Sequence, residues 1–440
     1  MQPEENGPLK GKGRGKAKSG KGKGDKGSQG QKGKNGKGRG PGDPEDGGDP
    51  GGDPDDFLSA FTDFSSADWN FLDSVDMVAE SKKPCPTLRK VPPKHTRKVA
   101  SVLASVAHLA LHSSTAIARE RALKYWFLLP RLLFQAPLRN RRTGRNAKSV
   151  YAARTLLVGE RLAANARERF FEYQASLQPS VSGVRHSERL QARSSDFESH
   201  LSNEIMRQVH EGYISRASSL ASSPGLARVG EATAQILRNL WGREPHRPST
   251  PWTAPSNELQ ININSAVERK LHDSLRTAAK GSGAGLSGWR FEYLLPLLRA
   301  PSHEWESFRN LAAAIAVGEG IPSWVRVVLS LGRATALKKG DAGVRPLVCH
   351  EPLRRLLTRA LVKDSEDAIQ EYLGPYQFAV GIAGGCPAMA LSVKKLAHQH
   401  KRLVFFKLDL VNAYNTQCRE DALLNLSNAS PELVSFLRKF

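Results

Sequence analysis

The first 56 residues contain almost no apolar side chains, so any folded structure must be built from the rest of the chain. From Lys10 to Arg39, twelve Lys or Arg residues alternate mainly with Gly; from Asp43 to Glu80 there are twelve acids and no base. Such segments bury too little apolar surface to offset the entropy lost on ordering. We therefore predict a disordered low-complexity tail over residues 1–80, first basic and then acidic. The basic part is either a non-specific RNA or DNA contact or a solvated tail.

The rest of the chain is basic in its own right. Residues 81–440 carry 53 Lys or Arg against 28 Asp or Glu, a net charge of +25. A surplus of this size favours a polyanionic partner, of which nucleic acid is the commonest. No run reaches the roughly 18 apolar residues of a spanning helix, and no apolar leader follows the start. We predict an intracellular protein, nuclear or cytoplasmic, that is neither secreted nor membrane-bound.

Cysteine spacing argues against a zinc finger or a disulfide framework. The four cysteines are far apart, with no CxxC pair and no His at ligand spacing, so they are typical of reduced intracellular thiols: Cys85, Cys349, Cys386 and Cys418.

Apolar periodicity predicts a helical basic region over residues 81–244, followed by a linker over 245–265 that contains PHRPSTPWTAPSN. From Val99, apolar residues recur at spacings of three, four and seven, as on one face of a helix. The segment LRNRRTGRNAK, which begins at Leu138, is predicted to be a basic loop, which either contacts a nucleic-acid backbone or is a solvated connection. Its cations are Arg139, Arg141, Arg142, Arg145 and Lys148.

The stretch GSGAGLSGWRFEYL contains Gly283, Gly285 and Gly288, which formally spell GxGxxG. A dinucleotide-binding motif needs a strand before it, whereas here the spacing of Val267 and Leu271 predicts a helix. We therefore reject a dinucleotide fold and expect a loop whose backbone approaches another group closely.

A β-hairpin is predicted over Gly332–Cys349, with residues 340–343 as a four-residue loop. This loop places Lys338 directly opposite Arg345, and two cations side by side call for an anion such as a triphosphate. The alternative is an exposed hairpin with basic side chains. In the helix predicted next, Arg354 and Arg355 either follow a nucleic-acid backbone or lie on a solvated face.

An apolar run from Leu403 to Leu408 predicts a strand covered on both faces, and Asp409 stands at its end. A carboxylate in such a place needs a hydrogen bond, a cation or a metal ion. Asp409 is therefore either a metal ligand or the cap of the next helix.

Four segments, in order, resemble the fingers and early palm of reverse transcriptases of non-LTR retrotransposons. GSGAGLSGWRFEYL is similar to their glycine-rich segment, ALKKGDAGVRPLV to their finger hairpin and GPYQFAVGIAGG to their Gln-x-Gly segment. KLDLVNAYNT is similar to the motif with the first catalytic aspartate. The resemblance runs from about residue 210 to the end.

This resemblance implies an α+β fold: a disordered N-terminal tail, a largely helical N-terminal region, and the fingers and partial palm of a right-hand polymerase over 266–440. It implies RNA-directed DNA polymerase activity with an RNA template, a DNA primer and dNTP as partners. Asp409 would be the catalytic residue, binding Mg²⁺ or Mn²⁺ together with the Leu410 carbonyl. The nucleotide would be bound by Lys338, Arg345, Gln377, Leu410 and Tyr414.

The family's second metal-binding segment, which contains Asp-Asp, is not found after Asp409. The only Asp-Asp pair is Asp55-Asp56, in the acidic run. We therefore expect a polymerase segment that ends within the palm, lacks carboxylates that the metal site requires, and is inactive alone. Asn412 and Asn415 also depart from the residues common in the family. The alternative is a non-catalytic, basic RNA- or DNA-binding protein that retains a polymerase-like scaffold.

Overall fold

The computed structural model describes residues 64–83, 85, 87–135, 162–177, 194–210, 212–223, 225–227, 230–241, 263–318, 320–339, 343–379, 381–409 and 417–439. The predicted basic loop at 139–148 and nearly all of the predicted linker lie outside these residues, as do Leu410 and Tyr414.

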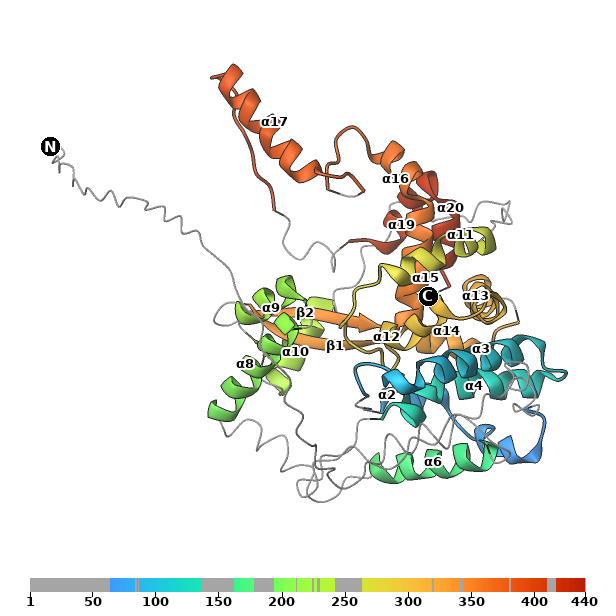
Figure 1. Ribbon diagram of the computed structural model, residues 1–440. Coiled ribbons are helices and arrows are strands. Elements are labelled where there is room, and N and C mark those ends of the chain that lie inside the picture. The colour runs from blue at the N-terminus through green and yellow to red at the C-terminus, as the bar shows by residue number, and fades with distance from the viewer. Residues whose placement is uncertain are drawn as a thin grey trace, which may run out of the picture. The chain divides into compact units, whose positions relative to one another are not determined.

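The described residues are mostly helical, with one two-stranded antiparallel sheet (Figure 1). Before the sheet the elements are η1 (Ala67–Leu72), α2 (Met77–Lys82), η2 (Pro93–His95), α3 (Thr96–His112), α4 (Ala116–Leu133), α6 (Leu162–Leu177), α8 (Ser194–His210), α9 (Ile214–Ala221), α10 (Glu231–Trp241), α11 (Ile263–Arg276), α12 (Phe291–Leu294), η3 (Leu295–Arg299), α13 (Ser302–Val317) and α14 (Ser323–Ser330). The sheet consists of β1 (Gly332–Lys339) and β2 (Gly343–His350), and α15 (Pro352–Asp364), α16 (Glu366–Leu373), α17 (Gly385–Gln399), α19 (Arg419–Ala429) and α20 (Pro431–Leu437) follow.

The predicted disordered tail is wrong for residues 64–80, which fold onto α4. Phe64 and Trp69 are fully buried, with ring centroids 4.3 Å apart, and the Trp69 ring lies 5.0 Å from that of Tyr125. Arg121 of α4 donates to Asp73 Oδ1 at 2.7 Å. Aromatic burial and this ion pair supply the free energy that the composition of the acidic run does not suggest.

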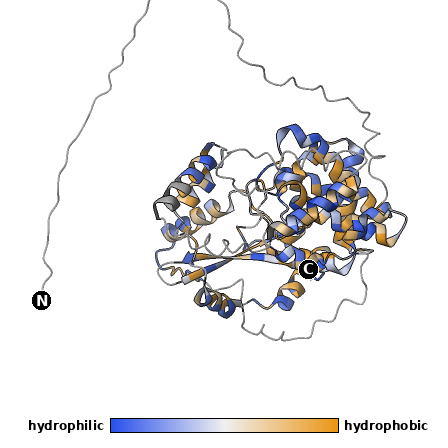
Figure 2. Ribbon diagram, turned by 90° about the horizontal axis from the view of Figure 1, so that it is seen from below, coloured by the Kyte–Doolittle hydropathy of each residue, from blue (hydrophilic) through white to orange (hydrophobic). Residues whose placement is uncertain are grey.

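One continuous core joins the regions that the sequence divides at the predicted linker. Leu103 of α3, Leu311 of α13 and Leu356 of α15 are all buried in it, although they come from both sides of that boundary. Helix α3 packs against α4 and α13, and α11 packs against α13 and α15. Hydrophobic segments gather in this group of helices (Figure 2). The hydrophobic core therefore extends across the boundary that the sequence predicts between the helical region and the polymerase region.

Helical periodicity predicted two of the buried helix faces correctly. On α3, Val99, Val102 and Val106 are buried, as their spacing requires. On α15 the buried residues are Leu353, Leu356, Leu357, Ala360 and Leu361. Among the described residues, no helix is both long enough and apolar enough to cross a bilayer.

Candidate nucleic-acid interface

The hairpin forms where it was predicted, but its register differs by one residue. Lys339 pairs with Gly343, so the connection is three residues long, and Lys338 pairs with Val344 while Arg345 pairs with Leu337. Directly opposed residues share a face, so this shift places Lys338 and Arg345 on opposite faces of the hairpin. The predicted side-by-side pair of Lys338 and Arg345 is wrong, because Gly343 belongs to the strand and not to the loop.

The observed register brings a different pair of cations together. Arg345 and Lys339 lie on one face as diagonal neighbours, and Arg333 lies further along the same face. All three residues are exposed. This face can therefore present two cations to one anion near the tip of the hairpin, with Lys338 on the other face.

A short segment lines the outer edge of β1. Ala227 N donates to Ala336 O at 3.0 Å, and Lys338 N donates to Gly225 O at 3.0 Å. Because β2 occupies the other edge, the backbone of β1 is bonded on both sides near its end, which holds the strand that carries Lys338 and Lys339.

Two arginines after the hairpin are anchored at its base. Arg354 Nη1 donates to Ser330 O at 3.3 Å and lies 3.3 Å from His350 Nδ1. The guanidinium of Arg355 lies over the Phe291 ring, 4.8 Å from its centroid. Burial lowers the pKa of both arginines, and burial and then Arg354 lower the pKa of His350. Both side chains are half-buried, so they are positioned by the fold and are not free surface cations.

The glycine-rich loop approaches a buried carboxylate. Glu351, 1% exposed, accepts hydrogen bonds from Ser287 N at 2.7 Å and from Ser287 Oγ at 2.6 Å. A Cβ on Gly285 would lie 2.5 Å from the Cδ of Glu351. Burial raises the pKa of Glu351, and the bonds from Ser287 act in the opposite direction. The group that the loop backbone was expected to approach closely is therefore a side chain of the protein itself.

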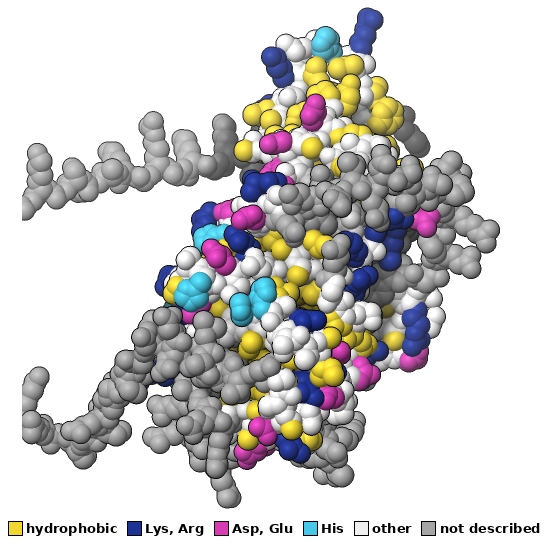
Figure 3. Space-filling model, turned by 90° about the vertical axis from the view of Figure 1, so that its right-hand side faces the viewer, with side chains coloured by type: hydrophobic (Ala, Val, Ile, Leu, Met, Phe, Trp, Pro, Cys, Tyr) yellow, Lys and Arg dark blue, Asp and Glu magenta, His cyan; other side chains and the backbone are white. Residues whose placement is uncertain are grey.

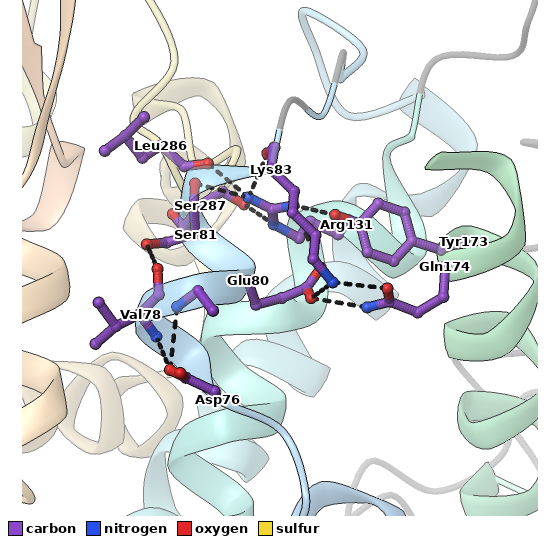
Figure 4. A network of polar contacts seen from close by, with 11 residues as sticks. Asp76, Val78, Glu80, Ser81, Lys83, Arg131, Tyr173, Gln174, Leu286 and Ser287 are labelled. Atoms are coloured by element: carbon purple, nitrogen blue, oxygen red, sulfur yellow. Dashed lines mark hydrogen bonds and ion pairs between the residues drawn. The ribbon is translucent and has the colours of Figure 1, made fainter. Parts of the chain in front are cut away.

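The carbonyls of the same loop are held by a buried arginine. Arg131 of α4 is 1% exposed and donates to Leu286 O at 2.7 Å and to Ser287 O at 3.2 Å (Figure 4). The same guanidinium donates to Ser81 O at 3.2 Å and to Lys83 O at 3.1 Å. One guanidinium thus ties the end of α2 and the residue that follows it to the glycine-rich loop.

A second acid completes this network. Glu80 lies 3.6 Å from Arg131 and accepts bonds from Lys83 Nζ at 2.6 Å and Gln174 Nε2 at 2.7 Å (Figure 4). Burial opposes the ionisation of Glu80, but these partners lower its pKa overall. Sequence reasoning missed Arg131, Glu80 and Glu351, most of whose partners lie far away along the chain. The only sequence signal was the presence of single charges within apolar runs.

The segment that ends in Asp409 differs from its prediction. Residues 403–409 form no strand, and Val404, Phe406 and Leu408 are 74%, 86% and 88% exposed. Asp409 is exposed as well. The predicted strand buried on both faces is therefore wrong here: no described segment pairs with this one, and an apolar run becomes a buried strand only when neighbours supply both its ladder bonds and its cover.

The preceding helix α17 is also exposed along its apolar side. Met389, Val393 and Leu396 are 47%, 42% and 43% exposed, and hydrophobic side chains gather at the top of the face in Figure 3, over this helix. Gln377 is half-buried and its Oε1 accepts a hydrogen bond from Ala379 N. The structure thus brings Lys339, Arg345, Arg354 and Arg355 into the hairpin and its base, but it assembles no cluster around Asp409 within the described residues.

Charged residues over the face in Figure 3 are mixed, with Lys and Arg lying between Asp and Glu. Among the described residues, no group of three or more His, Cys, Asp or Glu side chains is arranged to hold a metal ion. Comparisons of the chain with models of protein families, with curated proteins and with solved structures find no match.

Proposed function

We propose that the chain supplies the fingers and the first carboxylate-bearing segment of an RNA-directed DNA polymerase similar to those of non-LTR retrotransposons. The observation that carries the proposal is the basic hairpin, which stands between the glycine-rich loop and α15. Its order among the motifs matches the resemblance, and its exposed Arg345 and Lys339 share one face.

In this proposal the hairpin binds the triphosphate of an incoming dNTP. The Arg345 guanidinium offers two parallel N–H donors to phosphate oxygens, and Lys339 adds a second positive charge from the diagonal position. Lys338, on the other face, would contact a strand backbone and not the same phosphate. Arg354 and Arg355, fixed at the base of the hairpin, lie in the segment that would follow the template.

Two divalent ions, Mg²⁺ or Mn²⁺, would assist attack of a primer 3′-hydroxyl on the α-phosphate. Asp409 suits such an ion because its carboxylate is exposed and oxygen is the ligand that Mg²⁺ prefers. One carboxylate does not hold two ions, so the remaining ligands must come from outside the described residues.

The test is a comparison of nucleotide binding with primer–template binding in the full chain. A radiolabelled dNTP is photo-crosslinked to the protein bound to an RNA template with a DNA primer. We expect Arg345→Ala to raise the Kd for dNTP by about tenfold or more, as loss of a charge-assisted contact implies, while the Kd for primer–template changes by less than about threefold.

Arg276→Ala is the matched control, since it removes one exposed guanidinium from α11. Equal weakening of both Kd values by Arg345→Ala would contradict the proposal and favour the non-catalytic binder, for which the net charge of +25 on residues 81–440 argues. That binder would also show steep salt dependence with no effect of dNTP.

Asp409 is tested by activity. In a form of the protein that extends a DNA primer on RNA, Asp409→Asn should abolish extension while leaving primer–template affinity within about twofold, because the substitution removes a metal ligand and not a nucleic-acid contact. Extension at the parent rate would remove Asp409 from the proposal.

A further inference from the structure

Two histidines are the exposed residues of a helix that is otherwise buried along most of its length. On α3, residues 99–107 are all buried, and between residues 99 and 112 only His108 and His112 are exposed. Residues three or four positions apart share one face of a helix, so these two continue a polar line that begins at Ser101 and Ser105. The serines are 7% and 4% exposed, so this line reaches solvent only at the two histidines.

The two imidazole rings lie close together. Their centroids are 4.5 Å apart, and their planes meet at 40°. Side chains four positions apart on a helix lie one above the other, which brings the rings to the same side of the last turn of α3. Neither ring forms a hydrogen bond with another residue that the structure describes. The ring nitrogens of both histidines therefore remain available to a ligand.

Two imidazoles at this spacing form a chelating group for a metal ion. Helices with the HExxH motif bind Zn²⁺ through two histidines four positions apart on one face. Zn–N bonds of about 2.0–2.1 Å place two coordinating nitrogens about 3.3 Å apart in tetrahedral geometry, and rings whose centroids are 4.5 Å apart can present nitrogens at that spacing. Leu109 stands where HExxH has its glutamate, so this pair offers metal binding without the general base of a metalloprotease.

The surroundings favour a metal that binds through nitrogen. Imidazole suits Zn²⁺, Cu²⁺ and Ni²⁺, whereas Mg²⁺ is bound by carboxylate, carbonyl and water oxygens. Arg119 Nη1 donates to Ser113 O at 2.7 Å, so a positive charge already lies next to the end of α3. This charge repels a second cation, which disfavours an ion held by electrostatic attraction alone.

The pair is distinct from any cysteine-based site. The absence of a CxxC motif excludes a zinc finger, but the sequence expectation that no His stands at ligand spacing overlooks this pair, because that spacing was judged from the cysteines. Of the twelve histidines in the chain, only His108 and His112 stand four positions apart.

We propose that His108 and His112 chelate a divalent transition-metal ion at the end of α3. Two protein ligands leave at least two coordination positions to water, so the ion exchanges with solvent and the fold does not depend on it. The proposal is independent of the polymerase proposal, since it concerns other residues than Arg345 and Asp409 and another class of metal than Mg²⁺.

The test is protection of individual histidines from diethyl pyrocarbonate, measured by peptide mass in the full chain without a polyhistidine tag. Zn²⁺ is the probe at about pH 7.5, where an ordinary imidazole with a pKa of about 6.5 is mostly neutral. We expect Zn²⁺ to protect His108 and His112 over the same concentration range, while the exposed His303 of α13 stays reactive. Mg²⁺ should protect none of them. Zn²⁺ bound at the exposed Cys386 does not disturb this measurement, because protection is read at each histidine.

Single substitutions establish whether the two rings bind one ion. In His108→Gln and in His112→Gln, the remaining histidine should require at least about tenfold more Zn²⁺ for half-protection, because the second imidazole no longer binds an ion that the first already holds. His303→Gln is the matched control and should change the half-protection concentration at His108 by less than about twofold. Circular dichroism establishes that each variant is folded.

No protection of either histidine at about 1 mM Zn²⁺ would overturn the proposal and show that the pair is an aromatic contact only. Protection of the two histidines over different concentration ranges would also overturn it, as would protection of one that is unchanged when the other is replaced, because both results describe independent imidazoles. Equal protection by Mg²⁺ would overturn it as well, since imidazole would then not be the ligand.

Discussion

Substitution of Gly285 by alanine should destabilise the protein severely, through Glu351. The new methyl carbon would lie 2.5 Å from both Cδ and Oε1 of Glu351, whereas carbon atoms in contact are normally about 3.5–4.0 Å apart. The carboxylate must therefore move by about 1 Å or more, and it is 1% exposed. Such a movement breaks its bonds to Ser287 N and Ser287 Oγ. Two hydrogen bonds to a charged group at about 1.5–3 kcal/mol each give an expected loss of about 3–6 kcal/mol.

Urea unfolding followed by circular dichroism measures this loss, and a double-mutant cycle identifies its cause. Glu351→Ala removes the group that the methyl meets, so Gly285→Ala should cost less than about 1 kcal/mol in that background. Gly230→Ala is the matched control, because a Cβ there meets nothing within 4 Å. A cost for Gly285→Ala below about 1 kcal/mol in the parent, or an equal cost in both backgrounds, would refute the reasoning.

Three further predictions test other parts of the structure. Burial raises the pKa of Glu351 in the folded protein. The stability that protonated Glu351 contributes is therefore present below the unfolded pKa of about 4.5 and is lost as the pH rises through the folded pKa. Between pH 4 and 7 the parent should lose stability relative to Glu351→Gln, as measured by urea unfolding. Trp69→Ala should lower the free energy of unfolding by about 3–5 kcal/mol. An unchanged free energy of unfolding would instead support a disordered tail over residues 64–80. The hairpin register predicts that the double variant Lys338→Cys/Val344→Cys forms a disulfide on mild oxidation, detected by peptide mass. The double variant Lys338→Cys/Arg345→Cys should not form one. The reverse result would support the four-residue loop instead.

Local patterns predicted the structure where one element determines its own burial. The faces of α3 and α15 follow from spacing alone, because a helix in a globular protein buries whichever side is apolar. The hairpin was predicted for a similar reason, from two β-prone runs around a glycine-rich connection. Its register was not, since the connection has a glycine at each end and either three or four residues can form the turn, and one residue decides which cations share a face.

Interactions between distant segments were not predictable from local pattern. Arg131 bonds to Leu286 O across 155 positions, and Ser287 bonds to Glu351 across 64. The acidic run was predicted to be disordered although part of it is folded. Its composition predicts disorder up to Glu80, yet Phe64 and Trp69 pack onto α4. Composition counts the charges of a segment, whereas its folding depends on whether another segment offers its aromatic residues a place to pack.

The same reasoning changes which residue should carry the functional argument. In the sequence, Asp409 stands out because an acid at the end of a buried strand requires a partner. In the structure it is exposed, so water can solvate its charge and the requirement for a metal disappears as a physical argument. The evidence for an anion site on the hairpin remains, because the backbone register itself places Arg345 and Lys339 on one face. The polymerase proposal therefore depends first on Arg345, and nucleotide binding tests it more directly than the aspartate does.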